Sequence, residues 1–545
     1  MSDLPPNVYR VAQRAFDAIP GGPWVYWIPD GLRRLFETLP KLGDVAQPRQ
    51  GLATADNFRF LRYWWEMGRG RIGFGCRDRA EALATGKRWF PIIKGSRTLD
   101  WAGTEYEVVN WQNDGEELRT FQGAVIRNPD FYFRNGLTLT RVGPSGFSTR
   151  INSGGCLLDS SNTASFPQNF DIAVILLGVL NSGFVQTILR AINPTINFQV
   201  GDLVNLPVPR VDRTDMAKDV NQIIRFTLFQ VSSDETTFDF IAPPRWDTGL
   251  ADLAAAEARL AALEAQIDDE VYRLYAISDA DRAAIEAELA GGAPAAAEDE
   301  DAPPTEENEE PAAEPPMTRQ ELAVRWISYA VGVVLGRFSP GARGALGSAV
   351  YRREDFAVGS LPAPDEDEFD QLVGPLERFA YVDADGGRHV FPAEVEAALR
   401  ELTLPDGITV LDEGHPRDLP ALVEQALRLM LDGDMTATEP QRTRSEKEKA
   451  LCTPCLCGKS QADEVIEIGA GGDLRAFLSR DFFTRWHLRW YRKRPVYWPL
   501  QSARRGYGFV LFHERIDRST LYVLQRDYLD HRLNGLRLQI GDLRG

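Results

Sequence analysis

The residues best suited to ligand chemistry lie in a basic and aromatic run near the end of the chain. Between residues 480 and 515 there are nine Arg or Lys residues and two Asp or Glu residues, a local charge of +7 before histidine. Guanidinium and ammonium groups neutralise phosphates, and aromatic rings can pack beneath them or stack on bases. The candidate phosphate contacts are Arg485, Arg489, Arg492, Lys493 and Arg494, and the rings beside them are Trp486, Trp490 and Tyr491.

The spacing within this run predicts how its cations are presented. Arg485, Arg489 and Arg492 are four and three positions apart, which places them on one face of a helix. The functional interpretation is a nucleic-acid contact. The alternative is a buried aromatic stripe with a solvated arginine face.

Three cysteines form a second cluster. Cys452, Cys455 and Cys457 fall within six residues, whereas a structural zinc site takes four ligands. No second CxxC or pair of histidines lies nearby, and Cys76 and Cys156 are remote. These three are weak zinc candidates, and reduced cysteines in a loop are the favoured interpretation. Five scattered cysteines do not indicate a disulfide framework.

Neither the glycines nor the histidines indicate catalysis. VIEIGAGGDL at 465–474 has the look of a strand and a glycine loop, but the later acidic residue and further strands of a nucleotide-binding fold do not follow. A structural turn is predicted.

No histidine stands in an HExxH or Ser/Asp arrangement, so each is expected on the surface or in packing. The five are His389, His415, His487, His513 and His531.

The elements that must position these groups change character along the chain. Residues 1–40 read as a helical segment, with GLRRLFETL its second helix. Residues 41–210 are rich in Gly, Asn and aromatic residues, and seven of the twelve tryptophans fall before residue 150. Strands are predicted at 106–111, 124–128 and 137–142, and one buried helix at 173–192. This part is predicted to be a mixed recognition domain.

The second half is helical and strongly segregated by charge. Residues 211–290 are predicted to be a helical spacer, heptad-like over 251–290. Residues 291–316 contain nine acidic and no basic residues, which predicts a disordered linker. Thr318 and Glu321 form a capping-box pattern that opens a mostly helical C-terminal domain, 317–545. The expected fold class is therefore α/β to α+β, multidomain.

Composition limits the function classes. The chain has 545 residues and a net charge of -18, which argues against a uniformly basic nucleic-acid binder. Without the acidic linker the net charge is -9, so the average conceals unlike segments. No signal peptide and no apolar run of about 18 residues is found. A cytoplasmic protein without a membrane partner is expected.

Several segments resemble one protein family. They are GGPWVYWIPDGLRRLF, LGDVAQPRQGLATADNFRFLRYWWE, YEVVNWQNDGEELR, WISYAVGVVLGRF and DFFTRWHLRWYRKRPVYWPLQS, with INPTINFQVGDLVNLPVP (192–209) the most specific. They resemble the target-recognition and following part of phage-exclusion (BREX/Pgl) adenine-specific DNA methyltransferases. DISARM and type IIG restriction methyltransferases are related. The resemblance implies methyl transfer from S-adenosylmethionine to adenine N6 in double-stranded DNA.

The chain departs from that family in one large respect. No Asn-Pro-Pro or Asp-Pro-Pro followed by an aromatic residue occurs, although that motif receives the flipped adenine. The nearest sequence, Asn128-Pro129-Asp130-Phe131-Tyr132, is interpreted as a turn. No catalytic residue and no cofactor is therefore assigned to this chain. S-adenosylmethionine is expected in a separate catalytic domain or partner.

The resemblance also implies which residues read DNA. Arg, Gln and Asn side chains can form paired contacts with base edges in the major groove. The implied contacts are Arg49, Gln50, Thr54, Asn57, Arg59 and Arg62. Expected partners are DNA, a catalytic methyltransferase chain and other defence-system proteins. Two alternatives stay open: an inactive fragment, and a non-enzymatic interaction protein that binds protein or sugar.

Overall fold

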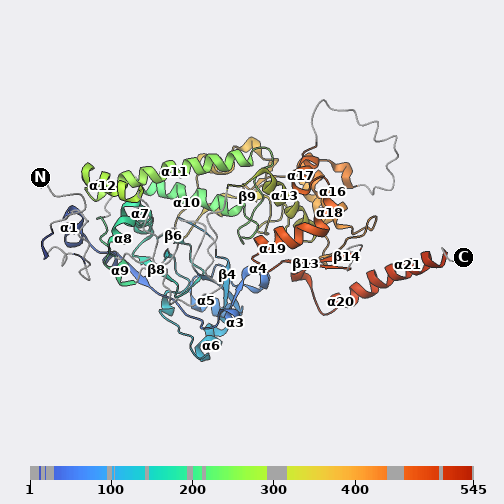
Figure 1. Cartoon of the computed structure of the whole chain (residues 1–545), viewed down its shortest axis with the longest axis horizontal. Helices are drawn as coiled ribbons and strands as arrows, with labels where there is room; N and C mark the ends of the chain where they lie inside the picture. Colours follow the sequence, from blue (N-terminus) through green and yellow to red (C-terminus); the bar gives the residue numbers. More distant parts are fainter. Residues whose placement is uncertain are drawn as a thin grey trace. The chain divides into compact units, whose positions relative to one another are not determined.

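The computed structural model describes residues 11–13, 19, 30–94, 101–103, 105–140, 147–192, 200–210, 216–290, 316–438, 460–502 and 507–542 (Figure 1). The chain forms two compact units. Unit 1 comprises 1–239, 248–316 and 351–378, and unit 2 comprises 240–247, 317–350 and 379–545. Unit 1 thus holds both the predicted recognition domain and most of the predicted spacer. The cysteine cluster and nearly all of the acidic linker lie outside the described residues.

The first sheet of unit 1 is antiparallel, in the order β1-β8-β5-β6. Its strands are β1 (Ala46–Arg49), β5 (Gly136–Thr140), β6 (Thr149–Asn152) and β8 (Asn162–Pro167). Leu137 lies opposite both Ile151 and Ser165, so these three side chains share one face. β5 confirms the strand predicted at 137–142 as far as Thr140.

The second sheet has the order β2-β4-β3-β7, in which only β7 runs parallel to its neighbour. Its strands are β2 (Leu61–Tyr63), β3 (Trp89–Ile93), β4 (Glu107–Asn110) and β7 (Leu157–Leu158). Every residue of β3 is buried, as its unbroken apolar run WFPII requires. β4 confirms the strand predicted at 106–111. Short helices surround this sheet: α3 (Asn57–Phe60), α4 (Trp64–Met67), α5 (Arg79–Ala84) and α6 (Gln112–Thr120).

The strand predicted at 124–128 is wrong. Only Val125 pairs, through an isolated bridge to Ala53. Asn128 takes a left-handed conformation (φ 48°), and a one-turn 3-10 helix follows at Pro129–Phe131. The left-handed residue ends the extended segment, because β-structure needs a negative φ. The same geometry confirms the turn predicted for Asn128-Pro129-Asp130-Phe131.

The single helix predicted at 173–192 is two helices. They are α7 (Phe170–Asn181) and α8 (Gly183–Ile192), bent by 72°. Ser182 between them is extended, and its Oγ accepts a hydrogen bond from Val185 N at 3.3 Å, as a helix-capping residue does. Residues 173–180 are buried, as predicted. Among the described residues, no single helix has the length and hydropathy to cross a membrane. The bent pair α7 and α8 has that length and hydropathy only when the two helices are taken together.

Three long helices complete unit 1. They are α10 (Met216–Ser232), α11 (Gly249–Leu274) and α12 (Asp279–Ala290). α10 and α11 pack on each other and on α7, and α12 packs on α8 (Figure 1). The heptad-like spacing predicted here marks one packing stripe of α11, with Leu263, Ile267 and Val271 buried. A Cβ at Gly178 of α7 would lie 2.9 Å from Val220 of α10, so glycine permits this close packing.

Unit 2 is built around α13 (Arg319–Val334), which contacts α15 (Ala393–Leu402), α16 (Leu419–Leu427) and α17 (Gln461–Ala470). Twelve residues of α13 are buried. An antiparallel sheet has the order β12-β14-β13, with β12 (Ile408–Val410), β13 (Tyr497–Gln501) and β14 (Gly508–Phe512). The mixture of helices and several small sheets agrees with the predicted multidomain α+β class.

The start of α13 was predicted from its cap. Thr318 Oγ1 accepts a hydrogen bond from Glu321 N at 3.1 Å, which confirms the N-cap. The Glu321 carboxylate lies 3.7 Å from Arg325 and 3.6 Å from Arg489. Glu321 therefore also brings acidic charge to the edge of the basic segment.

Candidate nucleic-acid interface

A tight turn in unit 1 sets the position of the predicted recognition residues. Ala55 has a left-handed φ of 58°, and the Asp56 carboxylate then caps α3 by accepting from Arg59 N at 2.9 Å. Thr54 is 3% exposed, and its Oγ1 lies 2.5 Å from Asn57 Oδ1. The hydrogen bond between Thr54 and Asn57 therefore stabilises the turn.

This turn presents one aromatic side chain to solvent. Phe58, the second residue of α3, is 77% exposed. The Arg62 guanidinium lies 5.7 Å from the centre of the Phe58 ring and also donates a hydrogen bond to the Phe58 carbonyl. On its other side Arg62 lies 5.9 Å from the ring of the buried Trp89. The Phe58 ring thus packs on the guanidinium of Arg62, which belongs to strand β2.

Two further arginines gather around one carboxylate. Glu117 of α6 accepts from Arg59 Nη2 at 2.7 Å and from Asn110 Nδ2 at 2.7 Å, and it lies 3.7 Å from Arg88. Hydrogen bonding by Arg59 holds the pKa of Glu117 below its usual range, so this carboxylate is ionised at neutral pH. We call Phe58, Arg59, Arg62, Arg88 and Glu117 the α3 patch. Phe58, Arg88 and Glu117 were not predicted from the sequence.

Arg49 and Gln50 lie at the end of β1, in the other sheet. The Arg49 guanidinium lies 5.0 Å from the ring of Phe131 and bonds Gln47 Oε1 at 3.3 Å. The Gln50 carbonyl accepts from Asn128 Nδ2 at 2.9 Å, so its backbone is tied to the neighbouring turn. Both side chains are half-buried. The six predicted recognition residues therefore belong to two neighbourhoods, the α3 turn and the end of β1.

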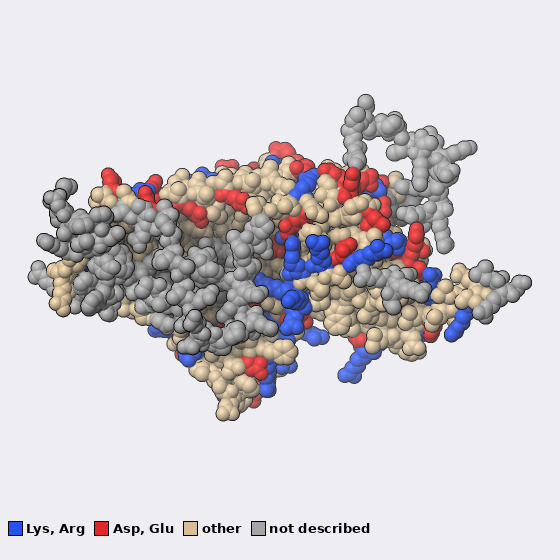
Figure 2. All heavy atoms as spheres, in the orientation of Figure 1, with Lys and Arg blue, Asp and Glu red and all other residues tan. Residues whose placement is uncertain are grey.

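The basic segment of unit 2 forms a helix and a turn. A π-helical stretch, Leu478–Trp486, leads into α19 (His487–Trp490). Arg492 and Lys493 have φ values of 49° and 61°, so the predicted helix face ends before Arg492. The side chains of all five predicted cations are exposed. Figure 2 shows lysine and arginine side chains gathered in the region of α19.

The aromatic residues of this segment differ in their availability. Tyr491 is fully buried and its hydroxyl is hydrogen-bonded to Arg337, so the prediction that its ring could stack on bases is wrong. Trp486 and Trp490 are half-buried and meet edge to face at 5.9 Å. Arg489 lies 5.0 Å over the Trp486 ring. Arg489 thus covers the Trp486 ring, and exposed arginines lie beside half-buried tryptophans, as the second interpretation of the sequence expects. The nucleic-acid contact stays a prediction.

His487 connects this segment to the chain that follows it, through a hydrogen bond in the core. It is fully buried, and its Nε2 accepts a hydrogen bond from Val496 N at 3.0 Å, so the ring proton resides on Nδ1. Burial, with Arg337 nearby, holds the pKa of His487 well below its usual range. His487 is therefore a neutral packing residue, as predicted.

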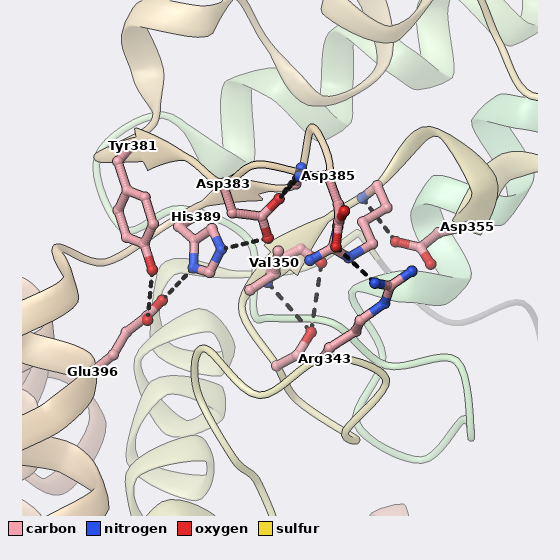
Figure 3. A network of polar contacts seen from close by, with 11 residues as sticks. Arg343, Val350, Asp355, Tyr381, Asp383, Asp385, His389 and Glu396 are labelled. Atoms are coloured by element: carbon pink, nitrogen blue, oxygen red, sulfur yellow. Dashed lines mark hydrogen bonds and ion pairs between the residues drawn. The ribbon is translucent and has the colours of Figure 1, made fainter.

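His389 is a buried packing residue of another kind (Figure 3). Its Nδ1 lies 2.6 Å from Glu396 and its Nε2 lies 3.1 Å from Asp383. The Tyr381 hydroxyl donates a hydrogen bond to the same Glu396 at 2.9 Å. The Tyr381 and His389 rings stack with their centres 4.0 Å apart. Asp383 in turn accepts from Gly387 N at 2.8 Å. The network fixes a turn between two short strands, β10 (Tyr381–Val382) and β11 (Arg388–His389).

The glycine sequence at 465–474 does not form a cofactor loop. Its first part belongs to helix α17, which ends at the left-handed Gly471, and Gly469 packs on Ala323 and Ile327 of α13. The predicted structural turn is thereby confirmed, while the strand of the rival interpretation is absent. Within the described ranges no group of three or more His, Cys, Asp or Glu residues could hold a metal ion. Cys452, Cys455 and Cys457 lie outside those ranges.

Comparison with known proteins points to methyltransferases. No family model matches the chain. It is 26% identical over 548 residues to the adenine-specific methyltransferase PglX of Lacticaseibacillus casei (strain Zhang), covering 96% of this chain. It is 27% identical over 533 residues to the adenine-specific methyltransferase BrxX of Escherichia coli O9:H4 (strain HS), covering 95% of this chain. The chain spans 39% of the length of each relative, so it matches a part of them.

Proposed function

We propose that this chain is the DNA-recognition part of a bacterial site-specific N6-adenine DNA methyltransferase in BREX-like phage defence. One observation carries the proposal. The similarity to adenine-specific methyltransferases runs along at least 95% of this chain, yet the chain spans 39% of their length and has no Asn/Asp-Pro-Pro-aromatic sequence. Methyl transfer and S-adenosylmethionine binding then fall to a separate catalytic domain or chain.

The two candidate surfaces suit different tasks. The exposed cations Arg485, Arg489, Arg492, Lys493 and Arg494 suit phosphates, which fix a protein on the duplex without reading sequence. The α3 patch suits base contact, because it combines the exposed Phe58 ring with Arg59 and Arg62. Thr54 and Asn57 serve recognition by shaping the turn. Arg49 and Gln50 remain proposed contacts at the end of β1.

The net charge of -18 does not oppose this assignment. Charges are screened over about 8 Å at physiological salt, so local concentrations of cations govern the field at a phosphate. Nine of the chain's 79 acidic residues fall in 291–316, and two fall in 480–515. A duplex held at the basic segment therefore experiences a positive surface.

The second candidate class is a non-enzymatic interaction protein. An exposed aromatic ring beside arginines also suits a sugar or a protein partner, and Phe58 is the observation that favours this class. Salt dependence separates DNA from a neutral sugar. Binding to DNA releases counterions, so its affinity falls steeply with salt, whereas stacking on a neutral sugar releases none.

The test is duplex DNA binding by the purified chain at salt concentrations between roughly 50 and 200 mM. We expect the logarithm of affinity to fall linearly with the logarithm of salt concentration. Co-expression with the catalytic chain of the same defence system, followed by methylation mapping, should then give one methylated adenine sequence. A chain that binds no duplex at the lowest salt contradicts the proposal.

A further inference from the structure

The last helix of unit 2 carries an apolar stripe that its own unit does not cover. The helical run starts at α20 (Thr520–Val523), passes through a π-helical stretch and continues as α21 (Asp530–Asp542). Leu524 and Tyr528 are buried against β12 and β14. Beyond them, every side chain from Leu529 to Ile540 is exposed except that of Arg532, which is half-buried. Arg532 lies 3.4 Å from Asp412 and marks where the helix leaves the unit.

The exposed apolar side chains follow the spacing of a coiled coil. Leu529, Leu533, Leu536 and Ile540 are separated by four, three and four residues and are 38%, 47%, 39% and 49% exposed. This alternation of three and four places them at successive d, a, d and a positions of a heptad. Leu538, which is 71% exposed, stands at an f position on the opposite face. The stripe is thus a seam for another helix.

An uncovered helix of this length would be marginal in water. Isolated helices shorter than about 12–15 residues are barely stable, and α21 contains Asn534 and Gly535, which are poor helix formers. Most helical stability in proteins comes from packing an apolar face. We propose that α21 pairs, antiparallel, with α21 of a second copy of this chain.

The charges that flank the seam select the antiparallel direction. With Leu533 against the partner's Leu536, and Leu529 against the partner's Ile540, Asp530 lies beside the partner's Arg537. Symmetry repeats this attractive pair at the other end. A parallel pair would instead place Arg532 beside the partner's Arg537, two like charges across an e/g contact. Complementary charge therefore favours a second copy in the antiparallel orientation.

The direction of the helix favours the same arrangement. α21 extends away from β14 and the core around Tyr528 (Figure 1). In an antiparallel pair the two cores lie at opposite ends of the paired helices. In a parallel pair both cores would start from the same end and compete for the same space.

The first test is the molar mass of the full chain, without DNA, as a function of concentration. Sedimentation should show a reversible monomer–dimer equilibrium. Replacing Leu533 and Leu536 together by Asp should give a monomer at every concentration. Leu538→Asp adds one negative charge, instead of two, on the opposite face of α21 and should leave the equilibrium unchanged. A chain that is monomeric at all concentrations overturns the proposal, as does a Leu538→Asp variant that weakens the dimer equally.

The second test determines the direction. Asp530→Arg should weaken the dimer by placing like charges at both ends, and Arg537→Asp should do the same. The double variant restores opposite charges and should restore the dimer. In a parallel pair residue 530 would face Gln525, so an unchanged Asp530→Arg dimer overturns the antiparallel arrangement. Because neither test involves DNA, their outcome is independent of the proposed function, and a cooperative thermal unfolding transition verifies that each variant is folded.

Discussion

Glu117 determines how much positive charge the α3 patch presents to a ligand. It accepts two hydrogen bonds from Arg59, at 2.7 and 3.0 Å, and lies 3.7 Å from Arg88. The pairs are solvent-exposed, so they contribute on the order of 0–1 kcal/mol to stability. Their main effect is electrostatic, because one ionised carboxylate offsets one of the patch's guanidinium groups. An approaching phosphate would be repelled by Glu117.

Replacing Glu117 by Gln should therefore strengthen DNA binding. The amide keeps a hydrogen-bond acceptor for Arg59 but removes the negative charge, so affinity for duplexes of any sequence should rise and the salt dependence should become steeper. Fluorescence anisotropy at several salt concentrations measures both. Glu116→Gln, an exposed neighbour with the same charge change, is the matched control. Equal gains in the two variants would contradict a specific role for Glu117.

Phe58 should contribute to binding and hardly at all to folding. Its ring is 77% exposed, so Phe58→Ala should change the unfolding free energy by about 0.5 kcal/mol or less. Stacking of a base on an aromatic ring contributes about 1–3 kcal/mol, so DNA affinity should fall by roughly fivefold to a hundredfold. Phe58→Trp should retain binding. Full affinity in Phe58→Ala would exclude this ring from the interface.

The sequence indicated one candidate turn, whose role in DNA recognition stays a prediction, but it did not indicate every residue that forms the surface of that turn. The resemblance selected the polar members of 49–62, and the structure places Thr54 inside the turn with Asn57 as its partner. Phe58 was missed because its exposure depends on the left-handed Ala55, which no propensity predicts for alanine. Glu117 was missed because it reaches Arg59 from 58 residues away.

His487 should make the stability of unit 2 depend on pH. Burial lowers the folded-state pKa of His487 below the value of about 6.5 for an unfolded chain. As pH falls below about 6.5, His487 binds a proton in the unfolded state but stays neutral in the folded state. The unfolding free energy therefore falls, by up to about 1.4 kcal/mol per pH unit, until the folded pKa is reached. This contribution to stability is complete above the unfolded pKa.

His487→Gln isolates that contribution. The glutamine oxygen can accept the hydrogen bond from Val496 N but does not titrate. Denaturant unfolding between about pH 7.5 and 5 should show a flatter pH dependence in this variant than in the parent chain. His531→Gln, which removes an exposed histidine, should not flatten it. Parallel pH profiles for the parent chain and His487→Gln would show that His487 binds its proton equally well in the folded and unfolded states.

At the scale of the element, the basic segment shows what spacing alone leaves out. The positions of Arg485, Arg489 and Arg492 predicted one helical face, but α19 ends at Trp490. Positive φ values at Arg492 and Lys493 then form a turn that spreads the cations. Helix 173–192 was likewise predicted as one element, because its apolar run continues through Ser182 and only the backbone reveals the 72° bend.

The basic segment should act on DNA of every sequence alike. Replacing Arg489, Arg492, Lys493 and Arg494 together by Ala should weaken binding uniformly and lower the salt slope by about one unit for each lost phosphate contact. The matched control replaces four other exposed arginines of unit 2, Arg343, Arg400, Arg518 and Arg526, and makes the same change in net charge. A folded four-Ala variant with unchanged affinity and salt slope would show that the DNA contact lies elsewhere.

At the scale of the whole molecule, covalent order proved a poor guide to packing. The predicted domains follow one another along the chain, whereas unit 1 takes in residues 351–378 and unit 2 takes in 240–247. Arg225 of α10, for example, bonds the carbonyl of Pro362 at 3.2 Å. Periodicity finds helices and strands but says nothing about such long-range pairings. The overall α+β character was predictable because it depends only on which elements are present.

The whole molecule should depend on a second component for catalysis. We expect the purified chain alone neither to bind S-adenosylmethionine nor to methylate DNA, because its one glycine-rich candidate loop is the end of α17 and the adenine-receiving motif is absent from its sequence. Calorimetry with S-adenosylmethionine measures the first, and transfer of a labelled methyl group to duplex DNA measures the second. Adding the catalytic chain should produce both activities. Micromolar binding of S-adenosylmethionine by this chain alone would place the cofactor site within it and remove the division of labour proposed above.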